Sequence, residues 1–205
     1  PGRGRSDRQA HRVYETNLYL PYHSDPSDVV GLLCVRRAKQ GGLSSLVSVA
    51  RIYNEILAHH PEYLGLYYRM FYFEHLCEPQ PSLSPIFSYH EGKLSCRYLR
   101  QYLELGCEIK GVPLSKVEVE ALDLFDRIMH DPGIRLAMML EPGDLQFANN
   151  YAVLHSRTEF EDHEDLALRR KMMANHPKHL AVLNAAAERA GWGKPLPAGH
   201  FQGIA

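Results

Sequence analysis

The 205-residue sequence predicts a mixed α+β protein with a mainly β core, a double-stranded β-helix (jelly roll) with a helical insertion and flanking helices. Two observations support this fold class. Segments rich in β-forming residues dominate residues 13–35 and the region from residue 134 to 173, and helical periodicity lies between them. Histidine and aspartate residues lie at the ends of these strands, and a double-sheet jelly roll presents strand ends to a central cavity.

The chain is long enough for one domain with a substantial core. We expect residues 1–205 to form a single domain that lacks part of its amino-terminal region, because the sequence begins at Pro1 without an initiator methionine. Residues 1–12 are expected to be a mobile basic lead-in, residues 45–132 a helix-rich insertion, and residues 176–205 a C-terminal helix and tail.

Composition and charge narrow the classes of partner. The chain has 23 Lys and Arg against 24 Asp and Glu, so its net charge of −1 gives no electrostatic reason to expect nucleic acid or an anionic membrane. No apolar run approaches the roughly 18–20 residues that would span a bilayer. The four cysteines show no Cys-x-x-Cys spacing, so we expect reduced, partly buried thiols and a cytoplasmic protein.

The first elements follow from local patterns. Residues 13–20 predict a strand that leads to His23, and the apolar run at residues 29–35 predicts a buried strand. Residues 40–42 predict a tight turn because they contain two glycines. Apolar residues at i, i+3, i+4 and i+7 predict an amphipathic helix over residues 49–59, and a second helix is expected over residues 62–68.

The middle of the chain is expected to contain aromatic, hairpin and helical segments. Residues 67–73 are unusually aromatic, which favours core packing over the alternative of a substrate-pocket wall. Residues 78–85 hold three prolines and predict a loop. Residues 85–98 predict a β-hairpin that turns on Glu-Gly. A capping box at Ser115 and Glu118 predicts the start of a helix that ends near residue 131.

The last third is expected to be mostly extended. Residues 134–140 and 145–154 predict two strands joined by a Pro-Gly turn at residues 141–144, and the second strand carries His155 at its end. Residues 168–173 are expected to be extended, and residues 177–190 to form a helix.

His23 and Asp25 form the first half of a candidate metal site. They are two positions apart, so their side chains lie on the same side of an extended segment. This pair alone is weak evidence, but His155 supplies a second imidazole later in the chain. Two histidines and one carboxylate that leave coordination positions open are the facial triad that holds non-haem Fe(II).

Four motifs in the same order along the chain give this site a family context. Together they resemble the taurine dioxygenase-like branch of the Fe(II)/2-oxoglutarate-dependent oxygenases, over roughly residues 13–175. The resemblance implies that His23, Asp25 and His155 bind Fe(II), with 2-oxoglutarate and O₂ as co-substrates. The motifs are His23-Ser24-Asp25, Gly41-Gly42-Leu43-Ser44-Ser45, and the segments at residues 142–150 and 154–162.

The same resemblance implies an anchor for the distal carboxylate of 2-oxoglutarate. In the family, a hydroxyl residue after the Gly-Gly turn and an arginine beyond the distal histidine bind this carboxylate. The hydroxyl is Ser44 here, where the family usually has threonine, and the arginine is Arg170 or Arg169. We prefer Arg170 because the anchoring arginine directly precedes a short strand segment, although residues 171–173 depart from the Leu-Trp-Leu-like run of the family.

Other nearby residues have alternative roles. Asn149 and Asn150 would orient the distal histidine or satisfy backbone groups. Arg157 would line the active site or make a structural salt bridge, and Tyr22 would form a wall of the iron site.

The resemblance implies a dioxygenase that oxidises an unactivated C–H bond of a small molecule, by hydroxylation or by desaturation or cyclisation, with release of succinate and CO₂. One alternative is a non-catalytic jelly-roll binding protein that retains a vestigial metal pocket. Another is a hydrolytic zinc site on the same three ligands, although the sequence places no obvious general base beside them. The identity of the substrate and the oligomeric state stay open.

Overall fold

The computed structural model describes residues 16–25, 27–74 and 79–174, and beyond them only residues 184, 185, 188, 189 and 191. The expected lead-in at residues 1–12 lies outside this part of the chain, as does nearly all of the helix and tail expected at residues 176–205. The expected organisation as a single domain stays a prediction. Within the described residues, no helix is long and apolar enough to cross a membrane.

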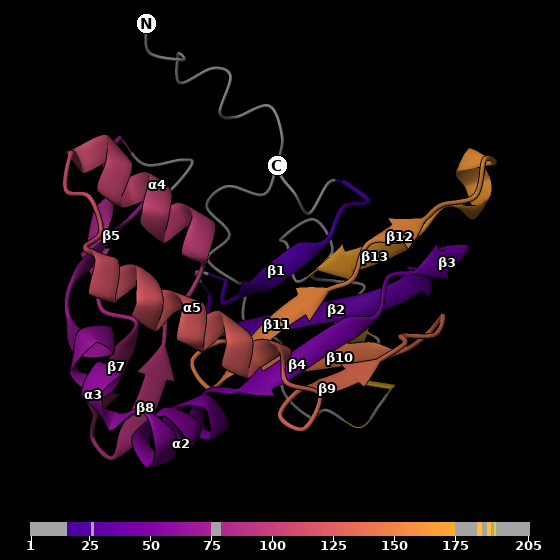
Figure 1. Cartoon of the computed structure of the whole chain (residues 1–205). Coiled ribbons are helices and arrows are strands. Elements are labelled where there is room, and N and C mark those ends of the chain that lie inside the picture. The colour runs from indigo at the N-terminus through magenta and orange to yellow at the C-terminus, as the bar shows by residue number, and fades with distance from the viewer. Residues whose placement is uncertain are drawn as a thin grey trace, which may run out of the picture.

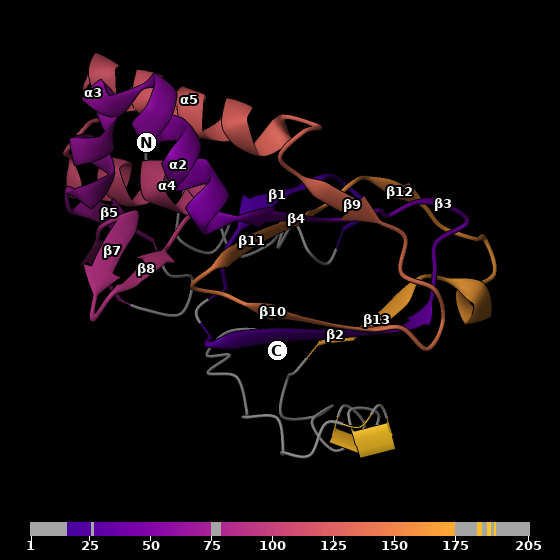
Figure 2. The ribbon, with the colours of Figure 1, turned by 90° about the horizontal axis from the view of Figure 1, so that it is seen from below.

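Two facing antiparallel sheets form the β part of the molecule. Figure 2 shows them as two layers, one with strand order β1–β11–β4–β9 and the other with strand order β10–β2–β13. The four-stranded sheet contains β1 (Leu20–His23), β11 (Val153–Arg157), β4 (Ser44–Ser48) and β9 (Leu136–Met138), and the three-stranded sheet contains β10 (Leu145–Asn149), β2 (Val29–Arg36) and β13 (Lys171–Ala174). The described strands face one another without closing into a barrel.

A short ladder lies beside the two sheets, where the predicted Gly-Gly turn occurs. β3 (Gln40–Gly41) pairs with β12 (Phe160–Glu161). Gly41 has a φ of +75°, and a Cβ atom there would lie 2.3 Å from the Glu159 carbonyl oxygen. Only glycine fits this close approach of two backbones, and Gly42 follows with a φ of +76°.

The helices and two short hairpins form a layer at one end of the sheets, with α5 extending along the four-stranded sheet (Figures 1 and 2). Ser115 accepts from the Glu118 N–H while the Glu118 side chain accepts from the Ser115 N–H, which confirms the predicted capping box. The elements are α2 (Val49–His59), α3 (Pro61–Leu64), the 3₁₀ helix η2 (Gly65–Tyr68), β5 (Phe71–Phe73), β6 (Ser82–Ser84), β7 (Phe87–His90), β8 (Lys93–Cys96), α4 (Arg100–Lys110) and α5 (Lys116–His130).

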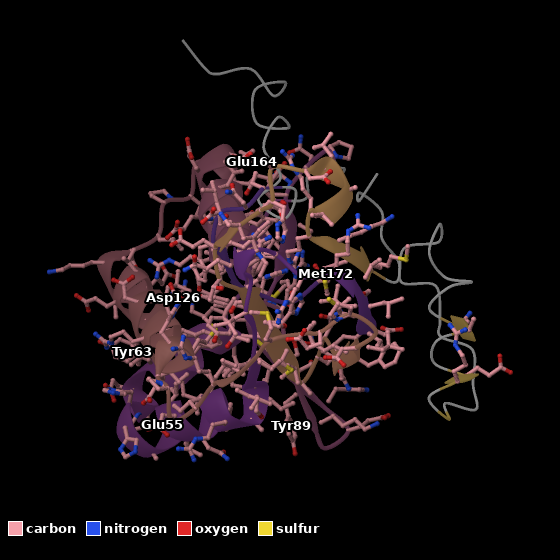
Figure 3. The ribbon with its side chains drawn as sticks, turned by 90° about the vertical axis from the view of Figure 1, so that its right-hand side faces the viewer. Glu55, Tyr63, Tyr89, Asp126, Glu164 and Met172 are labelled. Atoms are coloured by element: carbon pink, nitrogen blue, oxygen red, sulfur yellow. The ribbon has the colours of Figure 1, made fainter. Side chains whose placement is uncertain are left out.

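The hydrophobic core lies between this helical layer and the outer face of the four-stranded sheet. Tyr22, Val47 and Leu154 contribute the sheet side of the core. Figure 3 labels Asp126 on α5, in the helical layer, and Met172 on β13, in the three-stranded sheet. The helical side includes Ile52, Ile56, Tyr67, Phe87, Leu122, Phe125 and Met129. Because side chains alternate across a strand, the inner face of the sheet is left to other residues.

Most of the local predictions are confirmed. The buried strand expected at residues 29–35 is β2, and the amphipathic helix is α2 over the expected residues. The hairpin formed by β7 and β8 turns at Glu91 and Gly92, whose φ angles are +48° and +78°. The aromatic segment at residues 67–73 places three of its rings in the core, which confirms the core-packing interpretation.

Some boundaries differ from the predictions. β1 begins only at Leu20 and includes His23 itself, and β9 is shorter than the strand expected at residues 134–140. The loop expected at residues 78–85 contains β6, which pairs with β5. The extended segment expected at residues 168–173 begins with the end of a 3₁₀ helix, η3 (Leu166–Leu168), and continues into β13.

The prediction of one strand at residues 145–154 is wrong. The segment divides into β10 and β11, which belong to different sheets, and His155 lies in the middle of β11. The turn between them forms because the Asn149 side chain accepts a hydrogen bond from the Tyr151 N–H at 2.9 Å, and the Ala152 N–H donates to the Asn149 carbonyl. Asparagine favours such turns by bonding to its own backbone two residues on.

Helix α4 was not predicted. Its N-cap is Leu99, which offers no capping side chain, so the usual start signal is absent. Gly106 in its interior lowers helix propensity. The structure explains this glycine, because a Cβ atom there would lie 2.4 Å from the Tyr72 carbonyl oxygen on β5.

We expect Gly106→Ala to destabilise the protein by about 1–3 kcal/mol, because α4 would have to move away from β5 to admit the methyl group. Gly65→Ala is the matched control: an added Cβ meets nothing within 4 Å, and φ is −62°. That control should be neutral or stabilise by up to about 1 kcal/mol. Urea unfolding of both variants measures the difference, and equal stabilities would contradict the prediction.

Candidate metal centre

The three predicted metal ligands converge on the inner face of the four-stranded sheet. In the antiparallel pairing of β1 with β11, His23 lies opposite His155, and their ring centroids are 4.2 Å apart. Asp25 Oδ1 lies 3.6 Å from His23 Nε2, and Oδ2 lies 3.4 Å from His155 Nε2. One ligand atom from each residue lies within 4.8 Å of the others, and no other such group of His, Cys, Asp and Glu occurs in the described part of the chain.

Hydrogen bonds orient two of these ligands. His23 Nδ1 lies 2.8 Å from the Pro21 carbonyl oxygen, to which it donates, so the lone pair of Nε2 is directed toward the centre of the group. A hydrogen bond from the second ring nitrogen to a carbonyl is the usual arrangement for a metal-binding histidine. The Nδ1 atom of His155 is buried without a hydrogen-bond partner among the described residues.

Asn150 holds the loop that carries Asp25. Its Oδ1 accepts a hydrogen bond from the Asp25 N–H at 3.2 Å, and its Nδ2 donates to the Ser27 carbonyl at 2.7 Å. The structure therefore links Asn150 to the carboxylate ligand and not to the distal histidine. Asn149 forms the turn instead, which matches the backbone-satisfying alternative.

The electrostatic setting of the group suits metal binding. Burial, reinforced by the nearby His155, lowers the pKa of His23 to about 4. For Asp25, burial alone would raise the pKa, but the hydrogen bond to His155 and the charge of His23 lower it below its usual value. At neutral pH the His23 ring is neutral and Asp25 is ionised, which are the forms that coordinate metal ions.

Arg157 is a buried cation two residues beyond His155, on the same face of β11. Its guanidinium donates to the Thr16 carbonyl at 3.1 Å and to the Leu18 carbonyl, and it lies 4.6 Å from the centroid of the Phe160 ring. Burial, together with Arg170, lowers the pKa of Arg157 to about 10. The salt-bridge alternative is wrong, because no carboxylate of the described residues lies within 4.0 Å of this guanidinium.

Arg170 is partly buried, whereas its neighbour Arg169 is exposed. The Arg170 guanidinium is 5.2 Å from the Phe160 ring centroid, and a Cβ atom on Gly42 would lie 3.4 Å from its Nε. Burial lowers the pKa of Arg170. Arg169 is exposed, and its Nε donates to the His163 carbonyl at 3.3 Å. Adjacent residues of an extended segment point to opposite sides, so only one of the two can face inward.

Ser44 connects the two sheets across the interior. It pairs with Arg157 in the β4–β11 ladder, and its Oγ donates to Gln146 Oε1 on β10 at 3.0 Å. Gln146 was not among the predicted residues. The only indication in the sequence is that a polar residue stands between Leu145 and Phe147 in a predicted strand. The sequence alone does not show which face of that strand points inward.

Tyr22 does not form a wall of the site, so that prediction is wrong. It precedes His23 in β1 and therefore points to the opposite face of the sheet. Its hydroxyl lies 2.5 Å from Ser45 Oγ, and its ring packs edge-on against His130 of α5.

These residues fit the groups that an Fe(II) oxygenase would bind. Two imidazoles and a carboxylate on one face suit Fe(II) and leave coordination positions open. The same interior holds the Arg170 guanidinium, which forms no ion pair within 4.0 Å in the described chain, and buried donor atoms on Gln146 and Arg157 that lack acceptors there. Buried donors without partners are costly, so an anionic ligand would satisfy them.

Comparison with known proteins agrees with this site. The family model "Taurine catabolism dioxygenase TauD, TfdA family" matches residues 3–174. FR-33289 synthase of Streptomyces rubellomurinus is 41% identical over 170 residues, which are 80% of this chain and 50% of that protein. Taurine hydroxylase-like protein SAT17 of Stachybotrys chartarum is 31% identical over 147 residues, 69% of this chain and 38% of that protein. The chain therefore belongs to the TauD/TfdA family of dioxygenases, and it spans half or less of these relatives.

Solved structures share the fold. An asparagine oxygenase in complex with Fe(II), 3-hydroxyasparagine and succinate superimposes with a TM-score of 0.63 at 19% identity, over 77% of this chain and 49% of that chain. PvcB, an Fe, α-ketoglutarate-dependent oxygenase from an isonitrile synthetic pathway, gives a TM-score of 0.55 at 19% identity, over 81% and 59% of the two chains. The predicted mixed α+β, β-rich jelly-roll fold is confirmed.

The lowered pKa of His23 predicts that the metal-free protein loses stability as the pH falls. The unfolded chain binds a proton at this histidine below about pH 6.5, whereas the folded chain does so only near pH 4. Between these values protons favour unfolding, by about 3 kcal/mol in total. Urea unfolding in chelator-containing buffer from pH 7 to pH 4 should show this loss.

His23→Asn should flatten this pH dependence, because the group that titrates differently in the two states is gone. The control is His90→Asn, on a histidine whose side chain is 88% exposed. It should keep the wild-type profile. A wild-type profile in His23→Asn would contradict the prediction.

Proposed function

We propose that this chain provides the catalytic core of an Fe(II)- and 2-oxoglutarate-dependent dioxygenase. It would oxidise an unactivated C–H bond of a small molecule, by hydroxylation or by desaturation or cyclisation, with release of succinate and CO₂. The observation that carries the proposal is the convergence of His23, Asp25 and His155 on an inner sheet face. Membership of the TauD/TfdA family supports it independently.

In this proposal the three converging side chains hold Fe(II). Bound iron, together with the 2-oxo acid and O₂, supplies the oxidising power that no protein side chain has. The protein contributes a neutral imidazole at His23, an ionised carboxylate at Asp25 and a fixed loop between them. Asn150 and the Pro21 carbonyl keep this geometry before any metal binds.

We place the distal carboxylate of 2-oxoglutarate at Arg170, beside Ser44. The Arg170 side chain lies near Gly42, and its guanidinium forms no ion pair within 4.0 Å with a described carboxylate, although Asp162 bonds the Arg170 N–H at 2.7 Å. A guanidinium can bind a carboxylate through two parallel hydrogen bonds, which fixes orientation as well as affinity. Arg169 is unsuited to this role because its side chain is exposed and bonded to a loop carbonyl.

The substrate would be a small polar molecule, in a cytoplasmic reaction of secondary metabolism. A relative named as a synthase supports a biosynthetic role. Solved structures of the same fold hold 3-hydroxyasparagine or hydroxylated arginine. The free thiols of Cys34, Cys96 and Cys107 suit a reducing compartment.

The two alternatives have less support. A binding protein with a vestigial pocket would not need to retain all three ligands together with an unpaired inward arginine. A hydrolytic zinc site needs a general base, and no further His, Cys, Asp or Glu joins the ligand group within the described residues. That reading would also leave the inward arginine without a role.

Spectroscopy and product analysis test the proposed function together. Anaerobic addition of Fe(II) and 2-oxoglutarate should give a weak visible charge-transfer band, and admission of O₂ should then yield succinate. Asp25→Ala should reduce both signals, because one of three ligands is lost. No band and no succinate from the wild-type protein would overturn the proposal, and a band without succinate under any substrate would favour the binding-protein alternative.

A pair of adjacent substitutions tests the anchor. Arg170→Met should raise the dissociation constant of 2-oxoglutarate by about 100-fold, because a charge-assisted hydrogen-bond pair is lost. Arg169→Met is the matched control and should change it by less than about 2-fold, as expected for an exposed side chain. Anaerobic titration of the charge-transfer band measures both values. The reverse order of effects would show that the other arginine is the anchor.

A further inference from the structure

Gln146 is a buried amide with one half of its hydrogen-bonding capacity unused. It lies on β10, is 8% exposed, and shares the interior between the two sheets with Ser44. Its Oε1 accepts from Ser44 Oγ at 3.0 Å, whereas its Nε2 is buried without an acceptor in the described chain. A buried amide N–H₂ without an acceptor costs free energy, so the arrangement suits a ligand that supplies an acceptor.

The hydroxyl of Ser44 cannot serve two acceptors at once. A serine hydroxyl has one proton to donate, and here that proton goes to Gln146 Oε1. In this arrangement Ser44 holds the oxygen end of the amide, and the nitrogen end is left free. The Ser44 hydroxyl proton is therefore not available to a ligand, and the free donor at this position is Gln146 Nε2.

The neighbouring groups indicate the charge of the ligand. Arg170 and Arg157 both lie against the Phe160 ring, 5.2 Å and 4.6 Å from its centroid, and Arg170 Nε lies near Gly42. Arg157 is the cross-strand partner of Ser44. Two guanidiniums that form no ion pair within 4.0 Å in the described chain therefore lie close together on the Ser44 side of the interior, although Asp162 acts on Arg170 from a greater distance, and they favour an anion with oxygen acceptors.

We propose that Gln146 Nε2 donates a hydrogen bond to the distal carboxylate of the 2-oxo acid, and that Ser44 is a positioning residue that holds the amide for this contact. This assignment rests on the proposed function, and it adds a ligand-binding residue on the three-stranded sheet. The carboxylate is then held by the Gln146 amide on β10 together with the Arg170 guanidinium beside β13 of the same sheet. Such a site distinguishes a dicarboxylic 2-oxo acid from a monocarboxylic one.

The test compares two 2-oxo acids that differ only at the distal end. 2-Oxopentanoate has a methyl group where 2-oxoglutarate has its distal carboxylate. The dissociation constants of both acids are measured anaerobically on the Fe(II)-loaded protein, from the charge-transfer band. The variants are Gln146→Met, which keeps the length of the side chain, and Gln146→Glu, which keeps an oxygen acceptor for Ser44 but has no N–H donor.

Both variants should bind 2-oxoglutarate about 10- to 100-fold more weakly, as expected for the loss of a hydrogen bond to a charged group. Both should bind 2-oxopentanoate within about 3-fold of wild type, because that acid offers no distal acceptor. A further variant, Ser44→Ala, separates the direct role of Gln146 from a structural one. Because Gln146→Glu also adds a negative charge, Ser44→Ala is the variant that decides: it should cost less affinity for 2-oxoglutarate than Gln146→Met does. If Gln146 served only to hold Ser44, Ser44→Ala would cost at least as much as Gln146→Met, and the proposal would be overturned.

Two further results would also overturn it: an equal loss of affinity for both acids, or unchanged affinity for 2-oxoglutarate in Gln146→Met. Gln101→Met, on an exposed glutamine of α4, is the matched control and should leave both constants unchanged. A wild-type protein that gives no band with 2-oxoglutarate would instead count against the proposed function. Thermal unfolding of each variant shows whether it is folded.

Discussion

The antiparallel pairing of β1 with β11 is the constraint on which the candidate site depends. It places His23 opposite His155, although 131 intervening residues separate them in the chain. Side chains directly opposite in adjacent strands are close enough to share a ligand, and a one-residue slip of this register would turn one imidazole to the other face. The neighbouring β11–β4 pairing then places Ser44 opposite Arg157, so one ladder fixes both the metal ligands and the anion-binding groups.

The two faces of β11 show how one strand serves packing and function together. Leu154 points outward into the apolar core, and His155 and Arg157 are buried on the inward face, where Phe160 lies against the Arg157 guanidinium. The helical layer covers the outer face, so burial of apolar surface stabilises the sheet without filling the interior. The interior can therefore hold polar groups whose partners are ligands.

The three candidate ligands and the preferred arginine could be predicted from the sequence because they lie in short motifs. Strand periodicity indicates the His-x-Asp pair, and resemblance to a family indicates His155 and Arg170. The elements that depend on contacts between distant parts of the chain were not predicted. The turn at Asn149 that separates β10 from β11 interrupts an otherwise continuous β pattern, and α4 lacks a capping residue at its start. Gln146 was missed because its role depends on which sheet faces Ser44, and no local pattern in β10 contains that information.

The residue between the two near ligands explains how the insertion and the site are joined. Ser24 points away from the metal ligands: its N–H donates to the Tyr98 carbonyl at 2.9 Å, and its Oγ accepts from the Tyr98 N–H at 3.1 Å. Tyr98 in turn donates to Asp126 of α5 at 2.7 Å. On its other side the same loop is bonded to Asn150. The loop that carries Asp25 is thus held between the helical layer and the β10–β11 turn. Within the described residues, the insertion acts on the metal site through Ser24 and not through a ligand of its own.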